Sequence, residues 1–325
     1  MKKKLLSLLM AASMIASLTG CGSNDTNGKS SDDGTYTVGI CQLTQHVALD
    51  SATEGFKDAL KEEFGDKVVF DEQNAQNDSA TCSTIINSFV SKKVDLILAN
   101  ATASLQAAVN GTGDIPILGT SITEYGVALG IEDFDGTVGH NVSGTSDLAP
   151  LDKQAEMVKE FFPDAENIGL LYCSAEPNSK YQCDTVKKYL EEMGYKCEVY
   201  TFSDSNDISA VVTKAASSSD VIYTPTDNTV ASNANLIDSI CLDKKVPIIA
   251  GEEGIAKGCG IATLSISYYD LGYTTGKMAV KVLKGEADIS EMPIEYAPNY
   301  TKKCVKSRCD ALGIAIPEGY EIIEE

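Results

Sequence analysis

The sequence predicts an α/β protein made of two lobes, each a doubly wound parallel sheet with helices on both faces. The chain has 325 residues, about twice the ~150 of a typical domain. Short runs rich in valine, isoleucine and leucine alternate with amphipathic stretches, a pattern typical of strand–helix–strand units around parallel sheets. A glycine-, serine- and threonine-rich stretch at residues 136–146 divides these units into two similar groups, and we expect it to cross between the lobes.

The individual elements follow from this alternation. The strand-like runs lack strict alternation of polar and apolar residues, which favours strands buried on both faces. Strands are expected over residues 36–43, 68–72, 94–100, 115–119, 168–173, 197–202, 221–224, 246–250 and 261–266. Helices are expected over residues 48–64, 79–91, 151–162, 179–193, 208–217, 228–242 and 271–283. In the last of these helices, Ala279, Val280 and Leu283 keep helical spacing and Gly285 ends it.

The first 34 residues indicate export and a lipid anchor. Three lysines precede an apolar stretch, residues 5–18, that is too short for a comfortable membrane span. It ends in Leu-Thr-Gly-Cys, which resembles a bacterial lipobox; a plain secretion signal is the alternative. We expect residues 1–20 to be a lipoprotein signal peptide, Cys21 to carry the lipid and residues 21–34 to be a flexible tether. The folded body would then lie on the extracytoplasmic face of the cell membrane, touching it through the anchor only.

Composition excludes several classes of function. Lys and Arg total 26 against 47 Asp and Glu, a formal net charge of −21, and Arg308 is the only arginine. Such a chain is poorly suited to nucleic acid, because binding to phosphates depends on Lys and Arg. Two histidines without His-x-x-x-His spacing give little material for zinc, so we expect no metal. The glycine-rich nucleotide loops and the Gly-x-Ser-x-Gly motif are absent from the sequence, and we expect no cofactor and no enzyme.

Polar residues at the strand ends predict a cleft for a small polar ligand. Ligands of open parallel sheets bind beyond the carboxyl ends of the strands. The residues at seven successive strand ends are mostly hydroxyls and amides with isolated carboxylates, as in Thr226-Asp227-Asn228 and Gly251-Glu252. Because the same residue types cap helices, capping alone is the alternative role for each of them.

Motifs along nearly the whole mature chain resemble the ABC-transporter substrate-binding lipoproteins linked to aromatic amino-acid uptake. The most specific are Gln73-Asn-Ala-Gln76 and Pro225-Thr-Asp-Asn-Thr229; Asn141-Val-x-Gly-x-Ser-Asp147 also fits. Val47 departs from the family pattern, as do Ala103 and the segment 123–125, at the edge of the expected cleft.

The resemblance implies a type I periplasmic-binding-protein fold with three crossovers between the lobes. We place the crossovers near residues 139–146, 265–268 and 294–296. The N-terminal lobe would then comprise residues 35–142 plus 268–294, and the C-terminal lobe residues 143–267 plus 295–325. Hinge closure would trap the ligand, and the partners would be an ABC permease and its ATPase, with the binding protein itself a monomer.

The implied ligand is an amino acid, most simply an aromatic one, whose carboxylate needs donors and whose ammonium needs acceptors. The helix opened by residues 101–104 offers free N–H groups for the carboxylate, supported by Ser121 and Thr123. Asp227 is expected to hold the ammonium, with Glu176 second and helix capping as the alternative role of Asp227. The candidate binding residues are Gln42, Asp50, Thr102, Ala103, Ser104, Ser121, Thr123, Glu176, Ser179, Thr226, Asp227, Asn228 and Tyr268.

Two other functions fit the same sequence. An extracytoplasmic sensor that reports ligand occupancy to a membrane receptor would use the same lobes and tether. A two-lobed enzyme acting on a small polar metabolite is the third hypothesis; recovery of unchanged ligand would count against it.

Overall fold

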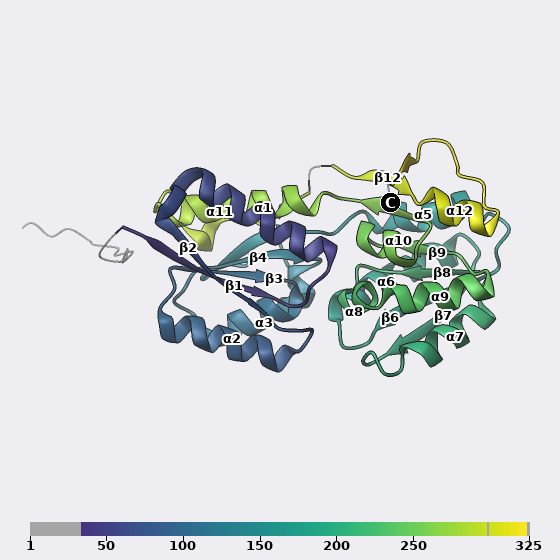
Figure 1. Ribbon diagram of the computed structural model, residues 1–325, viewed down its shortest axis with the longest axis horizontal. Helices are drawn as coiled ribbons and strands as arrows, with labels where there is room; N and C mark the ends of the chain where they lie inside the picture. The colour runs from purple at the N-terminus through teal and green to yellow at the C-terminus, as the bar shows by residue number, and fades with distance from the viewer. Residues whose placement is uncertain (1–33, 298, 324–325) are drawn as a thin grey trace, which may run out of the picture.

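The computed structural model describes residues 34–297 and 299–323; the expected signal peptide, Cys21 and all of the tether except Gly34 lie outside the described residues. The described chain forms two lobes side by side (Figure 1). Each lobe is a sheet with helices on both faces, which confirms the predicted fold class. Among the described helices, none combines the length and the apolar character that crossing a bilayer requires.

The N-terminal lobe contains a six-stranded sheet in the order β11-β5-β4-β3-β1-β2, with every pair parallel. Its strands are β1 (Tyr36–Gln42), β2 (Val68–Asn74), β3 (Leu96–Asn100), β4 (Ile117–Ile122), β5 (Val142–Ser146) and β11 (Glu295–Tyr296). Its helices are α1 (Val47–Phe64), α2 (Ser79–Lys92), α3 (Thr102–Gly111), α4 (Tyr125–Leu129) and α11 (Tyr268–Leu283), with 3-10 turns η1 (Gly65–Lys67) and η2 (Ile289–Glu291). Two apolar cores result, one beneath α1 and α11 and one beneath α2 and α3.

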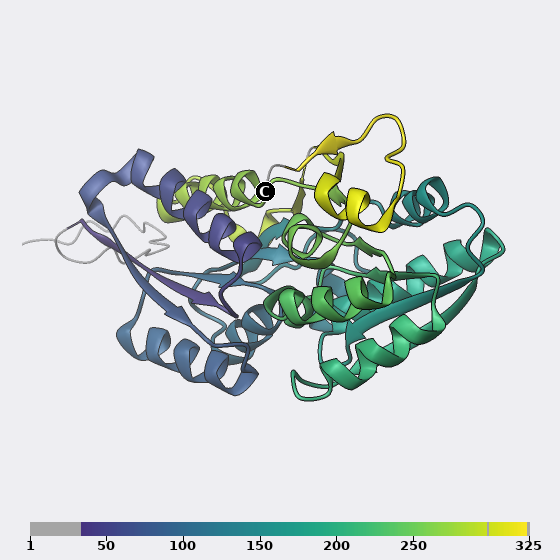
Figure 2. The same cartoon turned by 45° about the vertical axis from the view of Figure 1, so that its right-hand side comes forward.

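The C-terminal lobe contains a seven-stranded sheet in the order β13-β12-β10-β9-β8-β6-β7, parallel except where β12 meets β10. Its strands are β6 (Asn167–Cys173), β7 (Lys196–Phe202), β8 (Val221–Thr224), β9 (Ile248–Ala250), β10 (Ala262–Ser265), β12 (Thr301–Cys304) and β13 (Glu321–Ile322). Its helices are α5 (Leu151–Phe161), α6 (Pro177–Glu192), α7 (Ile208–Ser218), α8 (Asn228–Ser232), α9 (Ala234–Lys244), α10 (Glu253–Cys259) and α12 (Lys306–Leu312). Figure 2 shows the C-terminal segment that carries β12 and α12 lying against this lobe.

Three short connections join the lobes, and two of them differ from the prediction. They are residues 147–150 after β5, residues 266–267 before α11, and the segment that leads from β11 to β12. β5 and β11 pair with each other and complete the N-terminal sheet, so the boundaries expected at residues 142 and 294 move to about 146 and 296. Asp147 therefore opens the first connection instead of lying within a lobe.

Because β5 consists mainly of small residues, the sequence predicted a crossover between the lobes where the structure has a strand. A Cβ atom on Gly144 would lie 2.1 Å from the carbonyl oxygen of Gly119 and 2.4 Å from the hydroxyl of Tyr125. The strand therefore has no room for a side chain at residue 144, because the fully buried Tyr125 packs against it and donates to the carbonyl of Thr145. The small residues that suggested a linker are thus the residue types that this close packing requires.

The remaining differences concern helices and the three short strands β11, β12 and β13, which were not predicted. Every expected strand and helix is present with ends within three residues, except that residues 228–242 form two helices, α8 and α9. The break falls at Asn233, whose backbone leaves the helical region (φ −117, ψ 16) and whose side chain donates to the carbonyl of Thr229. Helices α4, α10 and α12 were not predicted; the N-cap of α10 is Glu252, whose carboxylate accepts from the amides of Gly254 and Ile255.

Candidate functional site

The two lobes enclose one polar cavity at the carboxyl ends of their strands, which we call the inner cavity. With the lobes in this position its free volume is about 10 Å³, room for about one water molecule, so a larger ligand enters only when the lobes move apart. Its lining residues are His46, Leu49, Ser121, Thr123, Asp147 and Tyr268 from the N-terminal lobe and its connections, and Asn178, Thr226, Asp227, Asn228, Ala231 and Glu252 from the C-terminal lobe. A small ligand in this space would touch both lobes at once.

Strand ends and helix starts place the N-terminal wall. His46 is the N-cap of α1, and Tyr268 is the first residue of α11, which packs against α1. Ser121 lies near the end of β4 in the left-handed region (φ 57), where the register with β5 shifts, and it contributes to the cavity lining. Asp147 follows β5, and its Oδ2 accepts from the Tyr268 hydroxyl at 2.8 Å, a bond that joins the first connection to the start of α11.

The C-terminal wall comes from three turns of the second sheet. Asn178 lies in the first turn of α6, after β6. Residues 226–228 connect β8 to α8, and Glu252 connects β9 to α10. Asn178, Asp227, Asn228 and Glu252 are about nine-tenths buried or more, whereas Thr226 is partly exposed.

Four buried polar atoms of this lining have no hydrogen-bond partner among the described residues. They are His46 Nδ1, Ser121 Oγ, Asp147 Oδ1 and Asn178 Oδ1. An unpaired buried polar atom costs about 1–3 kcal/mol, so native proteins rarely keep several in one place without a purpose. The unpaired oxygen of Asn178 can only accept a hydrogen bond. The same holds for the unpaired oxygen of Asp147 when this residue is ionised. The cavity is therefore prepared for a ligand that brings hydrogen-bond donors.

The charges of the cavity point the same way. Asp147, Asp227 and Glu252 line it, and no lysine or arginine among the described residues does. Burial raises the pKa of Asp147, and burial together with the charge of Glu176 raises the pKa of Asp227. Burial also raises the pKa of Glu252, an effect that the nearby His46 opposes. Carboxyl groups held at raised pKa favour a positively charged partner, since its arrival stabilises their ionised forms.

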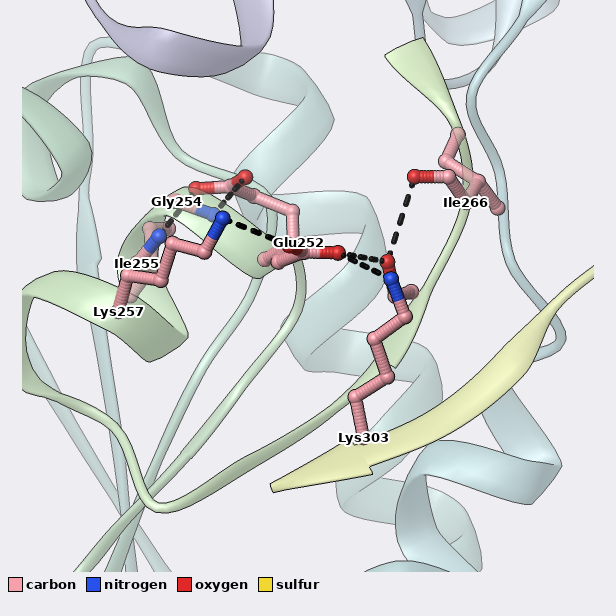
Figure 3. A network of polar contacts seen from close by, with 8 residues as sticks. Glu252, Gly254, Ile255, Lys257, Ile266 and Lys303 are labelled. Carbon is pink, nitrogen blue, oxygen red and sulfur yellow. Dashed lines mark hydrogen bonds and ion pairs between the residues drawn. The ribbon is translucent and has the colours of Figure 1, made fainter. Parts of the chain in front are cut away.

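Glu252 and its neighbour Glu253 show how local partners decide a carboxylate's role. Figure 3 shows this region, with Glu252, Lys257 and Lys303 labelled. Glu253 turns away from the inner cavity, accepts from Ser265 Oγ at 2.6 Å and pairs with Lys303 and Lys257 at 2.8 and 2.9 Å. Although burial acts to raise it, hydrogen bonds from Lys303, Ser265 and Lys257 lower the pKa of Glu253 to about 2. Glu252 has no such cation and keeps its oxygens on backbone amides at the cavity wall.

Asp227 and Glu176, the two residues expected to hold an ammonium, already have protein partners. Asp227 Oδ1 accepts from the amide of Val230 and Oδ2 from the amide of Cys173, both at 2.8 Å. Glu176 accepts from the backbone amides and side chains of Asn228 and Thr229. Asp147, by contrast, keeps one oxygen unpaired in the cavity.

The structure brings about half of the predicted site residues to the inner cavity. Ser121, Thr123, Thr226, Asp227, Asn228 and Tyr268 line it. Glu176 and Ser179 lie directly behind the C-terminal wall, where the hydroxyl of Ser179 donates to the carbonyl of Thr226. Thr102 is buried at the start of α3, and Ala103 lines a more open cleft between the lobes together with Glu176 and Thr229.

Three predicted residues lie elsewhere. Ser104 is fully buried, and its Oγ lies 3.6 Å from the sulfur atoms of both Cys41 and Cys82, so it belongs to the core of the first lobe. Gln42 and Asp50 bond each other at 2.7 Å and line a groove on the surface of the N-terminal lobe, away from the inner cavity. Gln42 ends β1 at the expected edge of the sheet, but its side chain bonds Asp50 and Thr53, both of which lie in α1.

The cavity also contains residues that the list of candidates omitted: His46, Leu49, Asp147, Asn178, Ala231 and Glu252. Asp147 closes the motif Asn141-Val-x-Gly-x-Ser-Asp147, and the wrong interpretation of β5 as a crossover hid its position at a strand end. Asn178 and Glu252 follow strands in the sequence and could have been included on that signal. Leu49 and Ala231 lie within helices and gave no polar signal.

Comparison with known proteins identifies this arrangement. A family model described as ABC transporter substrate binding protein matches residues 37–322. The chain belongs to this family. It is thus an extracytoplasmic protein of an ABC transporter that binds a small ligand and works with a permease. The chain is 38% identical over 305 residues to a tyrosine-binding protein of Clostridioides difficile strain R20291, covering 90% of this chain and 87% of that protein.

Two solved structures of similar proteins indicate how the lobes are arranged here. The first is an ABC domain in complex with L-Trp from Streptococcus pneumoniae (33% identity, 89% of this chain and 100% of that one covered, TM-score 0.84). The second is a ligand-free, open substrate-binding protein with adhesive properties from Clostridium difficile (39% identity, 89% and 99% covered, TM-score 0.68). The overall structure is therefore more similar to the L-Trp complex than to the open, ligand-free protein, although its identity to the latter is higher.

Proposed function

We propose that this substrate-binding protein captures an aromatic amino acid in the inner cavity, with the ligand's ammonium against Asp147 Oδ1. The observation that carries the proposal is the set of unpaired buried atoms in a cavity lined by carboxylates and lacking lysine and arginine. An ammonium group supplies three donors and a positive charge, which such a lining lacks. Ser121 Oγ, the unpaired hydroxyl, would donate to the ligand's carboxylate.

The aromatic part of the proposal has separate support. Leu49, Ala231 and the ring of Tyr268 give the cavity apolar surface beside its polar groups. The relatives that carry ligand names are a tyrosine-binding protein and an L-Trp complex. Because the ligand would contact both lobes only when they are closed, it would draw the population toward the closed form, which a permease recognises. The site lies within one chain, so we propose a monomer that binds without catalysis.

A thermal-shift and calorimetric screen tests the ligand class. At about 100 times its dissociation constant a ligand adds about 2.7 kcal/mol of stability, which for a protein of this size raises the Tm by several degrees. We expect this rise with L-tyrosine or L-tryptophan and not with the corresponding amines, carboxylic acids, nucleosides or sugars. A rise with sugars alone would contradict the proposed ligand. Recovery of the amino acid unchanged after incubation separates binding from the enzyme hypothesis.

We further propose that Cys21 carries the lipid that anchors the protein to the membrane. The support is the sequence of residues 1–21, with its lysines, short apolar stretch and lipobox-like end. Two or more acyl chains on one cysteine give stable anchoring, whereas one chain would be marginal. Cys21→Ser should therefore move the protein from the membrane fraction to the soluble fraction, as judged by cell fractionation. Equal membrane retention of the variant and the parent would refute the anchor.

The alternative role as a sensor for a membrane receptor has the same binding step. Reconstitution of uptake distinguishes the two, because a transport protein is required for radiolabelled amino acid to enter vesicles that contain the permease and its ATPase.

A further inference from the structure

The two lobes are joined across the cleft by a hydrogen bond that ends in the inner cavity. Nε2 of His46, at the start of α1 in the N-terminal lobe, lies 3.1 Å from Oδ1 of Asn228, at the start of α8 in the C-terminal lobe. The other ring nitrogen, Nδ1, is buried in the cavity lining without a partner among the described residues. Whether Nδ1 donates or accepts decides which ligand groups it can bind.

The orientation of the Asn228 amide settles the roles in this bond. Asn228 Nδ2 lies 2.8 Å from Glu176 Oε2, which also accepts from the backbone amide of Asn228 at 3.0 Å. An ionised carboxylate only accepts, so the atom that faces it must be the amide nitrogen. Oδ1 is then the atom that faces His46, and Nε2 must carry the proton that it donates.

We infer that Glu176, acting through Asn228, fixes neutral His46 as the Nε2–H tautomer, so that Nδ1 accepts a hydrogen bond from an N–H or O–H group of the ligand. This inference deepens the proposed function and shares its assumption that the inner cavity is the binding site. Glu176 is a positioning residue, since its own oxygens stay behind the cavity wall. With Asp147 Oδ1 and Asn178 Oδ1, His46 Nδ1 makes a third unpaired acceptor in the cavity.

A second contact between the lobes depends on the same carboxylate. Thr229 Oγ1 donates to Glu176 Oε1 at 2.8 Å, and the amide of Thr229 donates to the same oxygen at 2.9 Å. With its proton directed to Glu176, Thr229 Oγ1 can accept from Asn77 Nδ2 of the N-terminal lobe, which lies 3.1 Å away. Glu176 thus sets the direction of both bonds that close the lobes at this point.

The carboxylates nearest to His46 leave this assignment undisturbed. Glu252 lines the same cavity, but its oxygens accept from the amides of Gly254 and Ile255. One oxygen of Asp147 accepts from Tyr268, and the other has no partner, His46 included. A proton on Nδ1 would find an acceptor only after one of these carboxylates moved. Glu252 would have to leave its present hydrogen bonds, or Asp147 would have to turn toward the ring.

Nitrogen NMR of the ring reads the tautomer directly. The chain has two histidines, His46 and His140, so protein labelled with ¹⁵N-histidine gives two assignable rings, one of which is an internal reference. When the pH is raised until the ring is neutral, we expect the ligand-free protein to show His46 protonated at Nε2 alone. Addition of L-tyrosine or L-tryptophan should shift the Nδ1 resonance as that atom accepts a hydrogen bond.

Glu176→Gln is the decisive variant, because glutamine adds two N–H donors to a group surrounded by donors. When these N–H donors face Asn228, the side-chain amide of Asn228 turns over to present its oxygen to them. Its Nδ2 then faces His46, and the ring proton of His46 moves to Nδ1. We expect the Nδ1–H form to appear and affinity for the amino acid to fall about tenfold or more, with His140 unchanged. Asp220→Asn is the matched control: Asp220 also accepts two backbone amides and one side-chain amide, from residues 166 and 167 of the same lobe.

Asn228→Ala provides a second test should Glu176→Gln fail to fold. Loss of the acceptor should expose the Nε2 proton of His46 to rapid exchange with water. An Nδ1–H form in the parent protein would overturn the inference, as would a His46 ring that is unchanged in both variants. A change in Asn228→Ala alone would remove Glu176 from the assignment. These outcomes are read without ligand, so a failure of the proposed function, seen as no amino-acid binding by the parent, remains distinguishable.

Discussion

Asp147→Asn should weaken amino-acid binding by at least about 30-fold while the protein remains folded. Removing one member of a buried charge pair costs about 2–5 kcal/mol of binding, which corresponds to about 30-fold to several thousand-fold in Kd. Asparagine keeps the shape of the side chain and an oxygen that can accept from the Tyr268 hydroxyl. Because burial raises the pKa of Asp147, removing its charge should leave the ligand-free protein equally stable or more stable. Calorimetric titration and thermal unfolding measure the two effects.

Asp227→Asn is the matched comparison, since Asp227 lines the same cavity. Both of its oxygens accept backbone amides, so the substitution leaves one amide facing an NH₂ group and should cost about 1–3 kcal/mol of folding free energy. Its effect on affinity should be much smaller than that of Asp147→Asn. If Asp227→Asn instead loses more affinity and keeps its stability, the ammonium binds at Asp227, as the sequence alone suggested.

The pH dependence of binding gives the same assignment an independent signature. The pKa of Asp147 is raised in the ligand-free protein, so this carboxyl gains its proton sooner than an exposed one as the pH falls. The ammonium needs the ionised form, and affinity should therefore decrease as the pH is lowered through that raised pKa, with protons released on binding in the same range. In Asp147→Asn this part of the dependence should disappear. A parent affinity that rises on acidification would contradict the assignment.

Gly272→Ala is expected to lower the stability of the protein by about 3 kcal/mol, opposite in sign to the usual effect of alanine in a helix. Alanine normally favours a helix interior by about 0.5–1 kcal/mol over glycine. Here α11 crosses α1 so closely that a Cβ on Gly272 would lie 1.9 Å from the carbonyl oxygen of Ala52, and one on Gly55 would lie 2.1 Å from that of Tyr269. Both obstacles are backbone, so the helices must separate, and overpacking of this kind costs about 1–3 kcal/mol or more.

Separation of these helices should also displace residues of the inner cavity, because α1 begins after His46 and α11 begins at Tyr268. We expect the Tm to fall by several degrees and the affinity to weaken, as measured by calorimetry and titration. Gly113→Ala is the control: nothing lies within 4 Å of its would-be Cβ and its backbone is ordinary, so stability should change by less than about 0.5 kcal/mol. A stabilised Gly272→Ala would show that the two helices do not pack this closely.

The sequence by itself determined the fold class and the edge of the sheets at which the site lies. Strands buried on both faces read as continuous apolar runs, and parallel strands place all of their carboxyl ends at one edge, so Thr226, Asp227 and Ser121 were found without coordinates. The motifs that carry the family resemblance lie at the same strand ends. Local patterns suffice for such features because they depend on periodicity within a few residues.

Only the tertiary structure decided which polar groups face the cavity and which have other partners. Ser104 and Asp147 both follow a strand, yet one contacts two buried thiols and the other keeps an oxygen unpaired between the lobes. β5 was hidden because Tyr125 requires small residues at the place where it crosses the strand. The roles of Asp227, Glu176 and His46 depend on partners 52 to 182 residues away or on backbone amides, and a sequence records neither the distance nor the direction of such bonds.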